Sequence, residues 1–442
     1  MNVIIIGGDA AGMSAAMEMV RSSAEVHITV LERGDIYSYG QCGLPYIIDG
    51  TIPHTDELIA KRVEEFRAKG IDARVGHDVT HVNVETQHVE GVNVHTNAPF
   101  SLPYDKLIIA SGASPTMPNW HNKELAGIHT IKTIPQMHAL LADLEGKKHV
   151  TVIGAGYIAL EAAETLKSRG MDVRIIQRGK QLMSTVDTEL AACILAEAHR
   201  NGIEVLLETN TLGFVGNTRV EAVETSTGIY ETDVVIVATG VRPNTRFIQH
   251  TNMHTLGNGA IIVNGQMETS IRNIYAAGDC AAHYLRHIHR YTYIPLGTTA
   301  NKQGRIAGKN IIGELIDFKG IIGTSVLKFF DVTIGQTGMN HDSVDHMNAN
   351  VQIIRYTANN HAGYYPNVEE LHMCMFIHAR TQQLLGLQIV GGQGVDKRID
   401  VFATALTAGM HLGDLADLDL SYAPPYNGVW DPLQQIARRY AL

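Results

Sequence analysis

The sequence predicts an α/β fold with two parallel sheets, followed by a smaller α+β module. Two strand–turn–helix units with glycine-rich turns, at residues 2–21 and 149–161, predict the two sheets. A change to short alternating strands after about Ile321 predicts the terminal module. At 442 residues the chain is too long for a single core, and this length favours roughly two to four domains.

Charge and cysteine content argue against several classes of protein. The 35 basic and 45 acidic residues give a formal charge of −10 without a basic cluster, so a nucleic acid is not an expected partner. The N-terminus enters an apolar strand without a charged leader, and no apolar run reaches membrane-spanning length, so we expect a soluble, cytoplasmic protein. The four cysteines lie far apart without a CxxC pair, which argues against a disulfide framework and a structural zinc site.

The first unit predicts a nucleotide-binding turn. The apolar strand Asn2–Ile6 leads into Gly7-Gly8-Asp9-Ala10-Ala11-Gly12 and then into a helical pattern, an order that places a pyrophosphate at the helix N-terminus. The next strand ends in Glu32, twenty residues after Gly12, where a carboxylate holds a ribose diol. Asp9 stands in place of the fingerprint's second glycine, so an ordinary βαβ unit remains an alternative.

One cysteine, Cys42, lies in a stretch that favours reactivity. The run Tyr39-Gly40-Gln41-Cys42-Gly43-Leu44-Pro45-Tyr46 predicts a loop that turns into a helix just after the sulfur. Free backbone N–H groups of that first turn would favour the thiolate and make Cys42 nucleophilic near neutral pH. The alternative is a buried cysteine that acts as a small hydrophobe. The nucleotide-binding turns on either side of Cys42 in the chain favour the reactive thiol.

Further along the chain, two strands end in small-residue turns. We expect an amphipathic helix over Glu57–Lys69, short strands up to Phe100, and an apolar strand that ends at Ala110–Ala113. The strand Thr232–Ala238, followed by Thr239–Asn244, repeats this pattern.

An acidic residue and three histidines follow. Asp279 comes at a strand end beside a glycine, where it could hydrogen-bond a ligand's hydroxyl groups or cap a helix. His283, His287 and His289 are spaced somewhat like metal ligands. Because no cysteine or carboxylate completes that set, surface or packing roles are favoured and no metal site is expected.

The second unit carries the more complete fingerprint. The strand His149–Ile153 precedes Gly154-Ala155-Gly156-Tyr157-Ile158-Ala159, with both turn glycines present and an alanine at the third position. The following strand ends in Gln177-Arg178 instead of an acid. Gln177 does not repel a 2′-phosphate and Arg178 could pair with one, although Arg178 could equally be a solvent-facing charge. The pattern favours NADPH and leaves NADH open.

The terminal module has no nucleotide motif. Short strands at residues 325–330, 351–356, 372–377 and 384–390, with two late helices, are typical of a module that supports an interface. Two aromatic turns, Gly363-Tyr364-Tyr365-Pro366 and Ser421-Tyr422-Ala423-Pro424-Pro425-Tyr426, present phenol groups that could also be packing corners.

In this order the motifs resemble the FAD-dependent pyridine nucleotide-disulfide oxidoreductase family over essentially the whole chain. The resemblance implies a discontinuous FAD-binding domain at 1–114 and 243–320, an NAD(P)H-binding domain at 115–242 and a C-terminal dimerisation domain at 321–442. The FAD-binding residues it implies are Gly7, Gly8, Ala11, Gly12, Glu32, Arg33, Ser111, Gly112, Asp279 and Ala300. The NAD(P)H-binding residues it implies are Gly154, Gly156, Tyr157, Ile158, Glu161, Gln177, Arg178 and Gly240.

Within that family the chain is similar to the single-cysteine branch. The common disulfide reductases have CxxxxC, but Ile47 stands five residues after Cys42, and the C-terminal His-Pro pair of those enzymes is replaced by Trp430-Asp431-Pro432. The single-cysteine branch contains coenzyme A-disulfide reductases, NADH oxidases and NADH peroxidases. Oxidases and peroxidases carry a histidine where this chain has Ala10. The two tyrosine turns instead match the coenzyme A-disulfide reductases, whereas Gln41 and residues 426–430 depart from them.

The resemblance implies an NAD(P)H-dependent reductase of coenzyme A disulfide, or of a related disulfide or persulfide, that works through Cys42. In such a homodimer Tyr364 and Tyr422 would reach Cys42 of the other subunit, and Arg21, Ser38 and Gln41 are candidate substrate-binding residues. The alternatives are an oxidase or peroxidase with a cysteine sulfenic acid, a polysulfide reductase, and a flavoprotein that serves as redox partner to another protein.

Overall fold

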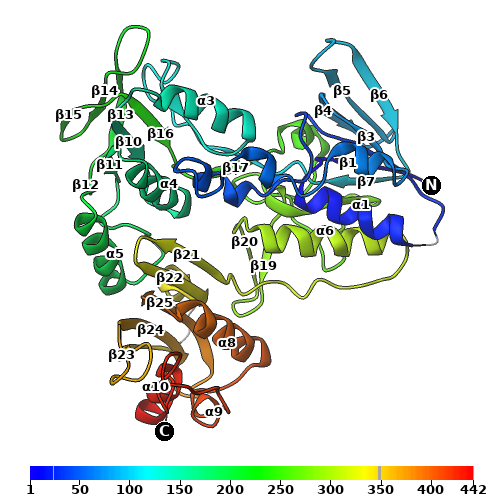
Figure 1. The fold of residues 1–442 in the computed structure, drawn as a ribbon. Helices are drawn as coiled ribbons and strands as arrows, with labels where there is room; N and C mark the ends of the chain where they lie inside the picture. The colour runs from blue at the N-terminus through cyan, green and yellow to red at the C-terminus, as the bar shows by residue number, and fades with distance from the viewer. Residues whose placement is uncertain (23, 347–349, 442) are drawn as a thin grey trace. The chain divides into compact units, whose positions relative to one another are not determined.

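The chain divides into two compact units. The computed structural model describes residues 1–22, 24–346 and 350–441 (Figure 1). The first unit contains residues 1–47, 52–115 and 241–321, and the second contains residues 48–51, 116–240 and 322–442, of which 347–349 and 442 lie outside the described residues. The terminal module thus groups with the second nucleotide-binding region. The division into three domains with separate ligands stays a prediction.

A parallel five-stranded sheet forms the centre of the first unit. Its strand order is β18-β7-β1-β2-β3, with bounds Ile274–Ala276, Lys106–Ile109, Asn2–Ile6, His27–Leu31 and Asp72–Arg74. The central strand β1 is paired on both sides, so its isoleucines and valine are buried almost completely. A strand covered on both faces reads as a continuous apolar run, which explains why the sequence predicted β1 with the correct bounds.

Two helices of the first unit pack unusually close to each other. α1 (Ala10–Arg21) and α6 (Gly297–Ile311) lie side by side below the sheet (Figure 1). A Cβ atom on Gly304 would lie 2.1 Å from the carbonyl oxygen of Ala11, and one on Gly308 would lie 2.6 Å from that of Ala15. Only glycine allows α6 to approach the backbone of α1 this closely.

The smaller elements of the first unit correct one expectation. Residues 57–69 do not form a single helix: a 3₁₀ turn at Thr55–Leu58 is followed by the short helix α2 (Val63–Arg67). The Ala60 N–H donates to the Ser38 carbonyl, which holds the chain out of a helix between these turns. Other elements are β4 (His77–Asn83), β5 (His88–Asn93), β6 (Pro99–Pro103), β8 (Ala113–Pro115), β17 (Val241–Pro243), η4 (Arg246–Thr251), η5 (Gly278–Cys280), β19 (His283–Leu285) and β20 (Arg290–Thr292).

The second unit opens with a sheet of the same design. Its parallel order is β12-β11-β10-β16-β9, with bounds Glu204–Leu206, Asp172–Ile176, His149–Ile153, Val234–Val237 and Ile128–His129. The helices are α3 (Ile134–Leu144), α4 (Tyr157–Ser168) and α5 (Thr188–Arg200). An antiparallel sheet that the sequence did not predict consists of β13 (Thr211–Val215), β14 (Ala222–Thr225) and β15 (Gly228–Glu231).

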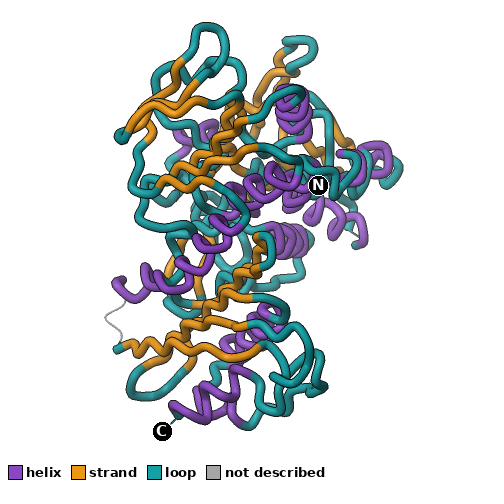
Figure 2. Tube along the Cα trace, turned by 60° about the vertical axis from the view of Figure 1, so that its left-hand side comes forward, coloured by secondary structure: helices purple, strands orange, loops and turns teal. Residues whose placement is uncertain are grey.

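The terminal module is an antiparallel sheet with helices. Its order is β21-β22-β25-β24-β23, with bounds Ser325–Phe329, Val332–Gly338, Leu384–Gly391, Glu370–His378 and Val351–Asn359 (Figure 2, orange). The helices are α7 (His341–His346), α8 (Val395–Ala408), α9 (Leu412–Ala416) and α10 (Pro432–Tyr440). The sequence predicted four of these strands and missed β22, whose glycines and threonines hide its apolar pattern.

The predicted fold class, two dinucleotide-binding sheets of Rossmann type and a C-terminal α+β module, is confirmed. Among the residues that the structure describes, there is no helix with the length and apolar character needed to span a bilayer.

Candidate active site

The first glycine-rich turn is shaped by backbone contacts and by one carboxylate. Gly7 has φ +107°, and a Cβ there would lie 2.1 Å from the Ala110 carbonyl oxygen, so no other residue fits. Glu32 at the end of β2 accepts hydrogen bonds from Gly8 N–H at 2.9 Å and Gly34 N–H at 2.8 Å, one on each oxygen. Each carboxylate oxygen has a second lone pair, so Glu32 can still accept from the hydroxyl groups of a ribose.

Small residues line the space next to this turn. Ala11 in α1, Ala277 before η5 and Ala300 in α6 form a buried cluster. A Cβ on Gly278 would lie 3.0 Å from the Ala11 methyl and 3.4 Å from the Ala300 methyl. The N-termini of α1 and α6 receive no side-chain cap from their N-cap residues, Asp9 and Leu296. Helix N–H groups without such caps, next to small residues, are suited to an anionic ligand that needs close backbone approach.

Asp9 holds the loop that carries the cysteine. Its Oδ2 accepts from the Gln41 side-chain amide at 2.5 Å, and its Oδ1 accepts from the Tyr39 N–H at 3.3 Å. Ser38 N–H donates to the Gly8 carbonyl at 3.0 Å, next to Asp9. Burial, together with the Asp9 and Glu32 carboxylates, raises the pKa of Tyr39. The residue that departs from the fingerprint therefore links the nucleotide-binding turn to the cysteine loop, a role that sequence reasoning missed.

The conformation around Cys42 corrects a prediction. No helix starts after the sulfur: Cys42 lies inside the 3₁₀ turn Gln41–Gly43, and a second such turn covers Pro45–Ile47. Gly43 N–H donates to the Gly40 carbonyl and Leu44 N–H to the Gln41 carbonyl, so these two N–H groups have backbone partners within the turn. The side chain of Cys42 is exposed, as a thiol that reacts with a soluble disulfide must be.

The other three cysteines differ from Cys42. Cys280 is fully buried, and burial raises its pKa to about 11. Cys374 is also buried, and burial raises its pKa to about 12. Cys193 lies half-buried on α5 and donates to the Glu189 carbonyl of its own helix. The high pKa values disfavour the thiolate form at Cys280 and Cys374, and Cys42 is the exposed cysteine of the described chain.

The second glycine-rich turn repeats the first with more open space. Gly154 has φ +115°, and a Cβ there would lie 2.3 Å from the Ala238 carbonyl oxygen. A Cβ on Gly156, the N-cap of α4, or on Gly240 would have no heavy atom within 4 Å. Open space over an uncapped helix N-terminus leaves room for a pyrophosphate. Arg178 is exposed and lies beside the half-buried Gln177, and its pairing with a 2′-phosphate stays a prediction.

Two predicted nucleotide residues make other contacts. The hydroxyl of Tyr157 lies 2.6 Å from Ser325 Oγ in β21 and accepts from the Gln336 side chain in β22 at 2.8 Å. This phenol ties α4 to the terminal sheet, so its hydroxyl already has two partners within the second unit. Ile158 is exposed on the first turn of α4. Ser111 Oγ donates to the Asn244 carbonyl at 2.6 Å and thereby joins the two small-residue turns of the first unit.

The two tyrosine turns of the terminal module meet. Tyr364 and Tyr422 are 58 residues apart in sequence, and their hydroxyl oxygens are 2.9 Å apart. The hydrogen bond with Tyr364 raises the pKa of Tyr422, and either hydroxyl can be its donor. Tyr365 instead packs edge-on against His361. Both phenols of the pair are exposed.

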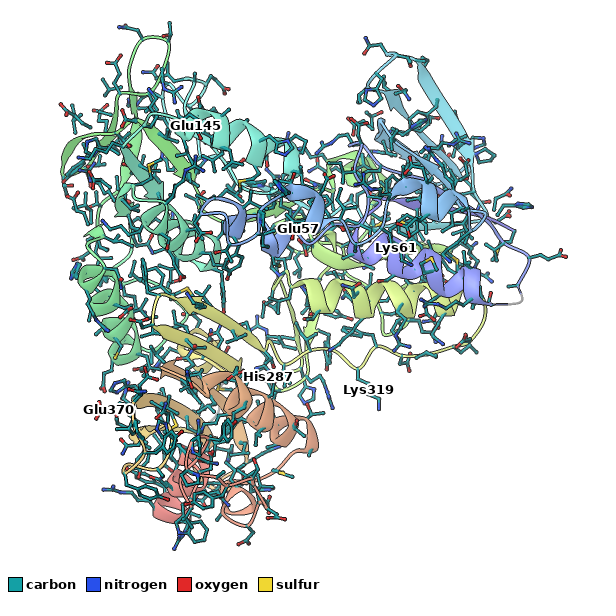
Figure 3. The ribbon with its side chains drawn as sticks, viewed as in Figure 1. Glu57, Lys61, Glu145, His287, Lys319 and Glu370 are labelled. Carbon is teal, nitrogen blue, oxygen red and sulfur yellow. The ribbon has the colours of Figure 1, made fainter. Side chains whose placement is uncertain are left out.

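The remaining candidates are less well placed. Arg21 lies at the C-terminal end of α1, the end away from the glycine-rich turn, and pairs with Glu18 at 3.1 Å. Ser38 has φ +46°. His287 lies at the hairpin β19–β20 (Figure 3). Burial lowers the pKa of His283 and of His287 to about 4, so both rings are neutral at physiological pH, as expected for packing histidines.

A different cluster has metal-ligand spacing among the described residues. It contains Asp187, His341 and Cys374 of the second unit. Arg355 donates to both oxygens of Asp187, and His341 Nε2 lies 2.7 Å from Oδ2. Because the guanidinium already neutralises the carboxylate, the cluster is better explained as a hydrogen-bonded ion pair than as a metal centre.

The comparisons with known proteins agree with this arrangement. The chain matches the pyridine nucleotide-disulphide oxidoreductase family over residues 1–304 and the dimerisation domain of that family over residues 324–432. It is 38% identical over 443 residues to the NAD(P)H sulfur oxidoreductase (CoA-dependent) of Pyrococcus furiosus, covering 99% of this chain and 98% of that protein. It is 30% identical to the coenzyme A disulfide reductase of Staphylococcus haemolyticus, covering 98% of each chain. The solved NAD-dependent persulfide reductase from A. fulgidus has a TM-score of 0.95 and 34% identity, with coverage of 99% of this chain and 82% of that one.

The chain therefore belongs to the pyridine nucleotide-disulphide oxidoreductase family, as the motifs predicted. It is an oxidoreductase that uses FAD and NAD(P)H. The first unit fits FAD, because two helix N-termini, Glu32 and the buried alanines form a cradle in which a larger side chain at Gly278 would collide. The roles of the individual cofactor-binding and catalytic residues stay predictions.

Proposed function

We propose that the protein is an NAD(P)H-dependent reductase of coenzyme A disulfide, or of a related coenzyme A persulfide, that works through Cys42. The exposed sulfur of Cys42, held on a turn anchored by Asp9, carries this proposal. No second cysteine stands at the CxxxxC position, and Cys280 in the same unit is fully buried. An internal dithiol relay is therefore not available, and the substrate's own sulfur must be the partner of Cys42. The names of the relatives support a coenzyme A-linked sulfur substrate.

The chemistry of the thiol balances as two steps. The Cys42 thiolate attacks one sulfur of the disulfide, the sulfur–sulfur bond breaks, and one coenzyme A thiolate leaves and takes up a proton. Cys42 then holds the other half as a mixed disulfide. Two electrons and a proton release this half as a thiol and restore the thiolate. FAD, when bound, supplies those electrons from NAD(P)H.

The tyrosine pair is the proposed proton donor. Either hydroxyl of the pair can be the donor, and when Tyr422 donates to Tyr364 the hydroxyl hydrogen of Tyr364 is free to point at a leaving sulfur. The contact of Tyr365 with His361 favours Tyr364 over Tyr365 in this role. The pair lies in the dimerisation domain, and we propose that it serves Cys42 of the other subunit in a homodimer. Ser38 and Gln41 remain candidate substrate contacts because they lie beside or within the cysteine turn, and the Gln41 amide already donates to Asp9. Arg21 lies at the far end of α1 and is paired with Glu18.

The test compares two cysteine variants that differ in exposure. Cys42→Ser should lower NAD(P)H-dependent release of coenzyme A thiol by at least about 100-fold, because serine cannot form the mixed disulfide. Bound FAD and NAD(P)H oxidation by an artificial quinone should not change. Cys193→Ser, the control on α5, should keep full activity. Undiminished disulfide reduction by Cys42→Ser would overturn the mechanism.

The substrate can be read from the cysteine itself. Intact mass of the non-reduced protein, before and after a thiol reductant, should show a coenzyme A-sized adduct that maps to Cys42. An adduct of one or two oxygens, with fast NADH oxidation in air and no need for a disulfide, would instead indicate an oxidase. Comparison of coenzyme A disulfide with coenzyme A persulfide by kcat/KM then decides between the two sulfur substrates.

A further inference from the structure

A buried arginine lies behind the tyrosine pair. Arg398 in α8 is only 1% exposed, and its guanidinium uses donors on all three nitrogens. Nε donates to Asp431 Oδ2 at 3.0 Å, and Nη1 donates to the Gly394 carbonyl at 2.9 Å. Nη2 donates to the Asn360 carbonyl at 2.9 Å and to Asn427 Oδ1 at 3.1 Å. This planar group therefore binds three separate segments of the module.

Two of these segments carry the tyrosines. Asn360 follows β23 and leads into the turn that contains Tyr364. Asn427 donates from its side-chain amide to the carbonyl of Ser421 at 3.2 Å, and Ser421 directly precedes Tyr422. Asp431 closes the second loop, because its Oδ1 caps α10 through the Leu433 N–H at 2.9 Å. Arg398 thus contacts the backbone four residues before Tyr364 directly, and the residue before Tyr422 through Asn427.

The phenols themselves have little packing to hold them. Tyr364 is 76% exposed and Tyr422 is 46% exposed, so the position of each ring depends on the backbone that carries it. The contact that the structure gives the Tyr364 hydroxyl, within the described part of the chain, is the one with Tyr422. A buried ion pair can often be replaced by apolar residues without loss of stability, so its stability alone does not account for Arg398. The planar fork of an arginine can instead fix the relative position of several acceptors.

We propose that Arg398 is a positioning residue for the Tyr364–Tyr422 pair and so sets how well the pair delivers a proton to the leaving sulfur. This inference rests on the proposed function, in which the pair is the proton donor. Arg398 does not touch the substrate. It acts through the Asn360 carbonyl and through Asn427, whose contact with Ser421 transmits the position of the guanidinium to Tyr422.

The experiment is a double-mutant cycle between the buried arginine and an exposed tyrosine. Arg398→Met removes the donors and keeps most of the side-chain volume, and Tyr422→Phe removes one hydroxyl. Each change alone should lower kcat for coenzyme A disulfide about 10- to 100-fold, because a small misplacement of a catalytic group has an effect of that size. The KM for NAD(P)H and the quinone reductase activity should stay within about twofold. The double variant should be no slower than Tyr422→Phe alone.

Two further variants keep the test informative if Arg398→Met folds poorly. Asn427→Ala breaks the link to Ser421 while the Arg398–Asp431 pair remains, and it should also lower kcat without a change in quinone reductase activity. Arg398→Lys keeps the charge but not the fork, so it should restore only part of the kcat.

The outcomes separate this inference from the proposed function. Multiplied losses in the double variant, or an equal loss of quinone reductase activity, would show a structural role for Arg398 and overturn the positioning role. Full kcat in Arg398→Met would also overturn it. If Cys42→Ser abolishes disulfide reduction but Tyr364→Phe and Tyr422→Phe are both fully active, the thiol mechanism stands and the positioning inference fails. If Cys42→Ser is active, the proposed function itself fails.

Discussion

The two glycine-rich turns share one backbone design and differ in what surrounds them. At the first position, Gly7 and Gly154 have nearly the same φ and approach the neighbouring strand equally closely. At the third position the turns diverge: a Cβ on Gly12 would lie 2.0 Å from the Gly7 carbonyl oxygen, whereas α4 accommodates the methyl group of Ala159 there. The helix of the first turn therefore lies closer to its strand.

The surroundings of the first turn are also more enclosed than those of the second. α6 presses on α1 through Gly304 and Gly308, while Gly156 and Gly240 face open space. The acid Glu32 directly follows β2 of the first sheet, and the amide Gln177 directly follows the corresponding strand β11 of the second. A tight, enclosed turn suits a cofactor that stays bound, and an open turn suits a nucleotide that exchanges in each cycle. We therefore expect the enclosed first turn to hold its cofactor for longer than the open second turn holds its nucleotide.

The largest effect expected from this comparison is at the third glycine. Gly12→Ala should destabilise the protein by about 1–3 kcal/mol and lower its FAD content, because the new methyl group collides with backbone that α6 prevents from moving. Gly156→Ala is the matched change in the open turn and should leave FAD content and the unfolding temperature unchanged while raising the KM for NAD(P)H. Flavin absorbance per protein measures the FAD content of the two variants, and thermal unfolding measures their stability. Equal behaviour of the two variants would contradict the difference in enclosure.

The next effect concerns the residue at the strand end. Gln177→Glu gives the second unit the acid of the first, and its charge would repel a 2′-phosphate. The ratio of kcat/KM for NADPH to that for NADH should fall by about 10- to 100-fold. Arg33→Ala, next to Glu32 in the first unit, is the control and should not change this ratio. An unchanged ratio in Gln177→Glu would mean that Gln177 does not face the adenosine ribose.

The smallest effect concerns Asp187, the N-cap of α5, which is hydrogen-bonded to Arg355 and His341 of the terminal module. Burial alone would raise the pKa of Asp187, but hydrogen bonds from Arg355 and His341 outweigh it and lower the pKa to about 2. A carboxylate with a depressed pKa stabilises the fold above its unfolded pKa near 3.8 and loses this contribution as the pH falls towards 2. The full contribution is about 2 kcal/mol.

Asp187→Asn checks the sign of this contribution. The variant should be less stable than the parent protein at pH 6 by about 2 kcal/mol or less, and the difference should shrink between about pH 4 and pH 3. Urea denaturation at several pH values measures it, and groups that titrate in both proteins cancel in the difference. A gap that stays constant with pH would show that Asp187 contributes through shape and not through charge.

The sequence predicted the parts of this molecule that depend on local signals. The apolar strands β1 and β10 are buried on both faces and end in glycines, so their bounds are visible in the sequence. Short sequence spacings also identify the two glycine-rich turns, at Gly7 and Gly154, and Glu32 twenty residues after Gly12. The branch of the family was visible because Ile47 replaces a second cysteine.

Other parts depend on contacts between distant segments. Asp9 looked like a defect in a fingerprint because its partners, Tyr39 and Gln41, lie about thirty residues away. The hydroxyl of Tyr157 binds strands 168 and 179 residues further along, so its part in the terminal sheet had no local signal. The helix expected after Cys42 does not form. Two 3₁₀ turns and the hydrogen bond between Gln41 and the distant Asp9 fix the chain there instead.

The Asp9 carboxylate limits which sequences can carry this cysteine loop, because the loop is hydrogen-bonded to it. A glycine at position 9 would complete the fingerprint and would remove both hydrogen bonds to the cysteine loop. A motif score that rewards glycine at the second position of the fingerprint would therefore rank a variant without these hydrogen bonds above the natural sequence. If residues 37–47 are grafted onto another flavoprotein, Asp9 must be introduced as well, because its hydrogen bonds to Tyr39 and Gln41 hold the loop against the glycine-rich turn.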